Sequence, residues 1–295
     1  MNAAAPEAGY RARTFTVGDG TQLYFRDYGD RLSTKTAVFC LSGLTRNSKD
    51  FHRLAMRMAA ERRVIALDYR GRGRSDYDQN PQNYQPETYV RDVLDLAAVT
   101  GVHRAIVIGT SLGGLVAMGL AVARPTLLAG VVMNDIGPEI PAAAIARIGS
   151  YAGKDESYGS WAEAVAECKT RYGLAHPGKS DADWNELTHD SFVEKAGLIV
   201  PDYDIRIAKA RPSGTPPDLW ALFGALANVP VLAIRGDLSD VLSAATFDKM
   251  AGAKVDLIRV TVPNCGHNPV LDEPEVRAAL DPFVARIDGR ETAHG

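Results

Sequence analysis

The chain has few of the features that mark disulfide-rich, membrane or nucleic-acid-binding proteins. Its three cysteines, Cys40, Cys168 and Cys265, are odd in number and far apart, which argues against a disulfide framework. No apolar run approaches the roughly 18 residues of a membrane helix, and residues 1–15 lack the apolar centre of a secretory signal. Lys and Arg (33) do not exceed Asp and Glu (36), so nucleic acid is not an expected partner. We expect a reduced, soluble, cytoplasmic protein.

The hydrophobic pattern predicts an α/β protein. With 295 residues, 46% of them hydrophobic, the chain has room for one large domain or two small ones. Short, β-branched apolar runs alternate with stretches of helical spacing, and such runs suit strands buried on both faces of a parallel sheet. The expected strands are 37–41, 64–67, 105–108, 131–133 and 229–234, and the expected helices between them are 51–60, 87–100 and 115–124. An antiparallel hairpin over 13–28 precedes them, so the predicted sheet is mixed but mostly parallel.

The alternation stops after Asn134 and resumes at Val229. Residues 138–217 contain no strand run of the same kind, and the segments 142–148, 161–171 and 184–196 have helical patterns. We therefore expect a core domain made of residues 1–137 and 218–295, interrupted by a helical insertion at 138–217.

The strongest local motif is Gly109-Thr110-Ser111-Leu112-Gly113. It lies where an apolar strand ends and a helical pattern begins, the position at which a nucleophilic serine projects beyond a sheet edge. The alternative is a glycine-rich helix entry with Ser111 as a simple N-cap. The strand–motif–helix context favours the nucleophile.

A serine hydroxyl needs a neighbouring base. Among the six histidines only His267 has a suggestive setting, in a loop between a strand pattern at 255–262 and a helix starting near Asp272. That loop leaves the same predicted sheet edge as Ser111, so His267 is the candidate base.

The histidine in turn needs a carboxylate that fixes its tautomer. Asp240, after the 229–234 strand, is the preferred candidate and Asp237 the reserve, because Gly236-Asp237 reads as a turn. Asp135, at the end of the 131–133 strand, is a third candidate that could reach the histidine from the other side.

An oxyanion that forms on a substrate carbonyl needs preorganised N–H donors. We expect one from the amide of Leu112, directly after Ser111. The second is expected from Leu44, in the loop after the 37–41 strand, where Gly43 lets the backbone turn inward.

These residues resemble the α/β-hydrolase superfamily. The order Ser111, Asp240, His267 matches its nucleophile–acid–histidine order, residues 68–76 (DYRGRGRSD) are similar to its D-x-R-G-x-G-x-S loop, and Gly266-His267 with Pro269 is similar to its G-H-x-P motif. The resemblance covers the chain outside residues 1–12 and the last few. It implies an eight-stranded, mostly parallel sheet flanked by helices, with residues 138–217 as a helical cap. Ser42-Gly43 departs from the common His-Gly of the oxyanion loop, and the acid turn is longer than the common G-x-x-D.

The function implied is hydrolysis of a carboxylic ester or lactone of a small, largely apolar substrate through an acyl-enzyme. No metal or organic cofactor is implied, and a homo-oligomer is possible. The alternatives are a carbon–carbon bond hydrolase of the meta-cleavage type and a small-molecule receptor of the same fold. Some large apolar residues of the insertion should line the pocket while most form its own core: Ile148, Tyr151, Trp161, Tyr172, Trp184 and Phe192. The arginines at 70–74 favour a salt-bridged structural loop over a phosphate site.

Overall fold

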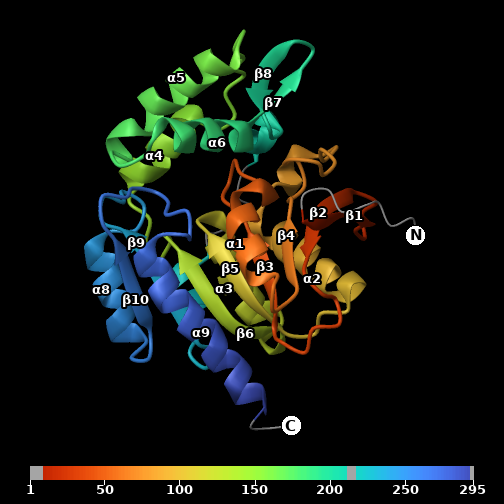
Figure 1. The fold of residues 1–295 in the computed structure, drawn as a ribbon, viewed down its shortest axis with the longest axis vertical. Helices are drawn as coiled ribbons and strands as arrows, with labels where there is room; N and C mark the ends of the chain where they lie inside the picture. The colour runs from red at the N-terminus through yellow and green to blue at the C-terminus, as the bar shows by residue number, and fades with distance from the viewer. Residues whose placement is uncertain (1–8, 211–216, 293–295) are drawn as a thin grey trace.

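The computed structural model describes residues 9–210 and 217–292 and is built around one eight-stranded sheet (Figure 1). The sheet order is β1-β2-β4-β3-β5-β6-β9-β10. Its strands are β1 (Tyr10–Thr16), β2 (Gln22–Tyr28), β3 (Ala37–Leu41), β4 (Val64–Leu67), β5 (Ala105–Thr110), β6 (Leu128–Asn134), β9 (Val231–Gly236) and β10 (Ile258–Val262). Residues 1–8 of the predicted core, 211–216 of the predicted insertion and 293–295 lie outside the described residues.

The predicted mixed, mostly parallel sheet is confirmed. β1 pairs with β2 and β2 with β4 in antiparallel fashion, and the other neighbours are parallel. β4, β5 and β6 are buried along their whole length, as expected of strands covered on both faces. Because parallel strands end at the same edge, the loops after β5, β6, β9 and β10 gather there.

Helices cover both faces of the sheet (Figure 1). α1 (His52–Met58) and α9 (Pro274–Thr292) share one apolar cluster with one face, including Leu54, Leu280 and Phe283. α2 (Pro86–Thr100), α3 (Leu112–Ala123), α7 (Leu219–Gly224) and α8 (Ala244–Ala253) contribute to the cluster on the opposite face. Within the described ranges, no helix has the length and apolar character required to cross a bilayer.

The segment between β6 and β9 carries elements outside the main sheet, and we call residues 142–201 the α4–β8 segment. It contains α4 (Ala142–Tyr151), α5 (Trp161–Tyr172), α6 (Asp181–Ser191) and a hairpin of β7 (Phe192–Lys195) and β8 (Leu198–Pro201). Figure 1 shows these elements together beyond one edge of the sheet. A separate small cluster that includes Cys168, Trp184 and Ile199 forms its core.

The hairpin corrects the expectation of a helix over 184–196 without strands nearby. The helix ends at Ser191, and Phe192 begins a strand that pairs with residues 198–201. Ala196 and Gly197 both have positive φ, 51° and 80°, as the central residues of a tight hairpin turn require. The sequence signal for the hairpin is the Ala-Gly pair with the short apolar run 198–200 after it, whereas Glu194 and Lys195 directly before it are charged.

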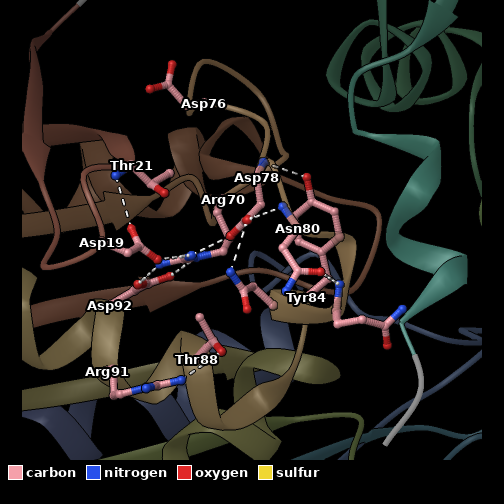
Figure 2. Close-up of polar contacts among 12 residues, drawn as sticks. Asp19, Thr21, Arg70, Asp76, Asp78, Asn80, Tyr84, Thr88, Arg91 and Asp92 are labelled. Atoms are coloured by element: carbon pink, nitrogen blue, oxygen red, sulfur yellow. Dashed lines mark hydrogen bonds and ion pairs between the residues drawn. The ribbon is translucent and has the colours of Figure 1, made fainter.

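The arginine-rich loop after β4 is held by carboxylates, as predicted. The flanking Asp68 accepts from the Arg74 amide at 2.9 Å, whereas the ion pairs come from carboxylates outside the 68–76 loop. Arg70 is 2% exposed and donates to Asp19 (2.7 Å), Asp78 (2.5 Å) and Asp92 (2.6 and 2.8 Å), as Figure 2 shows. Burial raises the pKa of Asp19, but the hydrogen bonds from Arg70 and Thr21 outweigh it and lower that pKa to about 2. Because three carboxylates already neutralise the Arg70 guanidinium, it is not available to bind a phosphate.

Candidate functional site

Ser111 lies on a sharp turn between β5 and α3. Its φ of 52° and ψ of −113° are unusual for a residue with a side chain, and the strain points to a functional position. The backbone around it is too close for larger residues: a Cβ at Gly113 would lie 2.0 Å from the carbonyl oxygen of Leu41, and one at Gly109 would lie 2.4 Å from Gly113. The two glycines of the motif therefore allow the turn that projects Ser111.

His267 reaches Ser111 from the loop between β10 and α9. Its Nε2 lies 3.0 Å from Ser111 Oγ, within hydrogen-bond distance, and its side chain is 10% exposed. The two residues are 156 positions apart in the sequence, and the parallel sheet brings them together because both follow strands at the same edge.

Asp135 is the carboxylate that contacts the other imidazole nitrogen. Its Oδ2 lies 2.7 Å from His267 Nδ1 and accepts a second hydrogen bond from Ser239 Oγ at 2.5 Å, while its Oδ1 accepts from the Gly236 amide at 2.9 Å. Asp135 is fully buried and follows β6 directly, with φ of 56°. Three donors thus converge on one buried carboxylate, which fixes its orientation towards the imidazole.

The prediction that Asp240 contacts His267 is wrong. Asp240 is about half exposed, and its carboxylate pairs with Arg147 of α4. The reserve candidate Asp237 also points elsewhere, since its Oδ1 accepts from the Cys265 amide at 3.1 Å. The physical reason is the register of the sheet: β6 and β9 are adjacent, so carboxylates after either strand start at the same edge, and only Asp135 is directed inward. The sequence offered no signal for Ser239 and its bond to Asp135.

The loop after β3, for which the sequence predicts an oxyanion donor, lies beside Ser111. Gly43 and Leu44 line the same cavity as Ser111, and Arg72 Nε donates to the Leu44 carbonyl at 3.0 Å. Ser42 Oγ closes the loop by donating to the Arg46 carbonyl at 3.0 Å. Leu112 opens α3, so its amide belongs to the first turn, whose N–H groups have no partner within the helix. The donor roles of Leu44 and Leu112 stay predictions.

A cavity lies between this edge of the sheet and the α4–β8 segment, with Ser111 and His267 in its wall. Four of the six large residues singled out in the sequence line it: Ile148, Tyr151, Tyr172 and Phe192. Trp161 and Trp184 instead contribute to the core of the segment. Charged side chains, among them Arg46, Lys179 and Asp190, also line the cavity, so its wall is partly apolar and partly charged. In the described ranges, no three His, Cys, Asp or Glu side chains are grouped to hold a metal ion.

Two titratable groups in the cavity wall have shifted pKa values. Burial, followed by the charge of Lys179, lowers the pKa of His176 to about 4, so its ring is neutral at pH 7. Its Nε2 lies 3.3 Å from the carbonyl oxygen of His267. Burial, followed by the nearby charge of Asp50, raises the pKa of Asp190 to about 6.

Comparison with known proteins agrees with the fold. A model of the alpha/beta hydrolase family matches residues 38–280. A solved alpha/beta hydrolase from Novosphingobium aromaticivorans has a TM-score of 0.90 and 41% identity, covering 95% of this chain and 100% of that one. A 3-hydroxybutyrate-oligomer hydrolase from Cupriavidus necator is 29% identical over 280 residues, 89% of this chain and 92% of the relative. A 2-(acetamidomethylene)succinate hydrolase from Mesorhizobium japonicum is 28% identical over 79% of this chain and 82% of the relative.

The family model spans most of the chain, and the Novosphingobium structure matches nearly all of it at substantial identity. This chain therefore belongs to the alpha/beta hydrolase family.

Proposed function

We propose that this protein is a serine hydrolase that cleaves a carboxylic ester or lactone through an acyl-enzyme, with Ser111, His267 and Asp135 as its catalytic triad. The observation that carries the proposal is the continuous hydrogen-bonded chain from Ser111 Oγ through both nitrogens of His267 to the buried Asp135. This is the arrangement in which a hydroxyl can be activated for attack on a carbonyl. A relative that acts on 3-hydroxybutyrate oligomers supports an ester as the bond that is cleaved.

In the first half of the reaction, Ser111 Oγ attacks the ester carbonyl carbon and His267 Nε2 takes the hydroxyl proton. Asp135 holds the Nδ1 proton and stabilises the imidazolium that forms. The amides of Leu44 and Leu112 donate to the oxyanion of the tetrahedral intermediate, where one such donor contributes roughly 3–4 kcal/mol of transition-state stabilisation. The carbon–oxygen bond to the alcohol then breaks, and the alcohol leaves with the proton from His267.

In the second half, His267 takes a proton from water, and the resulting nucleophile attacks the acyl carbon. Collapse of the second tetrahedral intermediate returns the proton to Ser111 Oγ and releases the acid. The α4–β8 segment acts as a cap that encloses the acyl group, because Ile148, Tyr151 and Tyr172 line the cavity opposite the triad.

The test is hydrolysis of a chain-length series of 4-nitrophenyl esters by the wild-type protein and the Ser111→Ala variant. We expect the wild type to turn over at least the short esters and the variant to lose at least about a thousandfold in kcat. Circular dichroism of the variant checks that the fold is retained. A wild-type protein inert towards every ester and lactone tried would contradict the proposal, as would a folded variant that retains activity. An inert wild type that binds ligand stoichiometrically would favour a receptor.

A further inference from the structure

One cation in the cavity wall has no ion-pair partner among the described residues. The cations that line the cavity are Arg46, Lys49, Arg53, Arg171 and Lys179. Four of them are paired: Arg46 with Asp50, Lys49 with Asp202 at 3.0 Å, Arg53 with Glu186, and Arg171 with Glu156 at 2.7 Å. Across the described part of the chain, Lys179 is the lining cation left without an ion-pair partner.

Lys179 is held close to the triad by its own turn. The segment from η4 (Gly173–Ala175) to Lys179 rests on the loop that carries His267: His176 Nε2 contacts the His267 carbonyl at 3.3 Å, and the Lys179 amide donates to the His176 carbonyl at 3.2 Å. The side chain of Lys179 is half-buried and faces the cavity that contains Ser111. A half-buried ammonium attracts an anion more strongly than one in open water.

The two acidic residues that follow Lys179 in the sequence form their contacts with other groups. Asp181, the nearer one, pairs with Lys169 at 2.6 Å. Asp183 accepts hydrogen bonds from the amide and hydroxyl of Ser180 as the capping box of α6, and this engagement directs its carboxylate to its own helix. His176 is neutral at pH 7 because its pKa is lowered to about 4, by burial first and by the Lys179 charge second. The positive charge on this side of the cavity therefore belongs to Lys179.

We propose that Lys179 is a specificity-determining residue that binds a free carboxylate of the substrate, so that the cavity selects monoanionic esters. This inference rests on the proposed ester hydrolysis. A single carboxylate fits better than a phosphate dianion, because the same cavity is also lined by acidic side chains: Asp50, Glu156, Asp183, Glu186 and Asp190. Tyr151, Tyr172 and Phe192 provide the apolar surface for the rest of the molecule.

The test compares esters that differ only in a carboxylate. The first pair places it on the acyl side: mono-4-nitrophenyl adipate against 4-nitrophenyl hexanoate. The second pair places it on the alcohol side: 4-acetoxybenzoate against 4-methylphenyl acetate. For each pair the measured quantity is the ratio of kcat/KM for the anionic ester to kcat/KM for the neutral ester, after subtraction of spontaneous hydrolysis.

In at least one pair we expect the wild type to prefer the anionic ester about tenfold, Lys179→Met to bring the ratio close to one, and Lys179→Glu to invert it. Lys154→Met is the matched control, an exposed lysine between α4 and α5 that does not line the cavity, and it should keep the wild-type ratio. Absence of a preference in both pairs, or a preference that survives in Lys179→Met, would overturn the role of Lys179. Failure of the wild type on the neutral esters as well would instead contradict the proposed ester hydrolysis.

Discussion

Replacing Asp135 with asparagine changes one carboxylate oxygen to an NH₂ group, and it should nearly abolish ester hydrolysis. Asp135 receives three hydrogen bonds, from His267 Nδ1, Ser239 Oγ and the Gly236 amide. An asparagine has one acceptor oxygen and an NH₂ group that only donates. If the oxygen stays on the Gly236 amide, the NH₂ faces His267 and favours the tautomer with its proton on Nε2. That nitrogen then cannot accept the Ser111 proton.

The alternative orientation of the asparagine is also costly. With its oxygen towards His267, its NH₂ would face the Gly236 amide, and two buried donors would be left without acceptors at roughly 1–3 kcal/mol each. The catalytically wrong tautomer is therefore the favoured one. We expect a loss of about 10⁴-fold in kcat, as for the corresponding substitution in other serine hydrolases, which is about 5.5 kcal/mol of barrier.

The assay is the initial rate of 4-nitrophenolate release at pH 7, with Asp240→Asn and Asp237→Asn as controls. Asp240 is exposed and pairs with Arg147, and Asp237 accepts a hydrogen bond from the Cys265 amide. Neither contacts His267, so kcat should fall by about tenfold or less in each control. Thermal unfolding shows whether each variant is folded. A folded Asp135→Asn variant with near-normal activity, or a 10³-fold loss in Asp240→Asn, would refute the reasoning.

Three further predictions concern stability. The pKa of His176 is about 4 in the folded protein and about 6.5 in the unfolded chain. The unfolded chain therefore binds the proton first as the pH falls, and the free energy of unfolding should decrease by up to about 3 kcal/mol between pH 6.5 and 4. Chemical denaturation should show a shallower loss in His176→Gln, and identical pH profiles would contradict this. Gly113→Ala should destabilise by more than about 3 kcal/mol or prevent folding, because its Cβ would meet the Leu41 carbonyl, whereas Gly252→Ala has open space and should change stability by less than about 1 kcal/mol. Equal melting temperatures for those two variants would count against the tight turn. Arg70→Met leaves the carboxylates around it without their cation and should cost about 3–5 kcal/mol, and an unchanged denaturation midpoint would be the contrary result.

The fold could be predicted because its strands are short, apolar and separated by helical patterns of ordinary length. β3 and β4 begin and end where the apolar runs 37–41 and 64–67 do, and the α4–β8 segment falls within the gap in that alternation. The hairpin of β7 and β8 was not predicted, because its strands are short and β7 follows α6 without a break. A local pattern assigned to one long helix was in fact a helix followed by a tight turn.

Some residues of the candidate site could be predicted from local motifs, whereas the carboxylate depends on contacts between distant segments. Ser111 and His267 each stand in a motif that can be read within a few residues, and the structure places their side chains 3.0 Å apart. The choice among Asp135, Asp237 and Asp240 depended on which carboxylate points inward at an edge where two adjacent strands end. That direction is set by the positive φ of Asp135 and by two donors, the Gly236 amide at the end of β9 and Ser239 in the loop after it. No spacing along the chain reveals these contacts.

Covalent labelling tests the central claim most directly. The wild-type protein is treated with a 4-nitrophenyl alkylphosphonate ester, which mimics the tetrahedral intermediate, and the modified peptide is identified by mass spectrometry. The account predicts one phosphonyl group per chain, attached to Ser111, with ester hydrolysis lost in proportion to labelling and no adduct on Ser111→Ala. A stoichiometric adduct on another residue, or full activity in a protein labelled at Ser111, would contradict it.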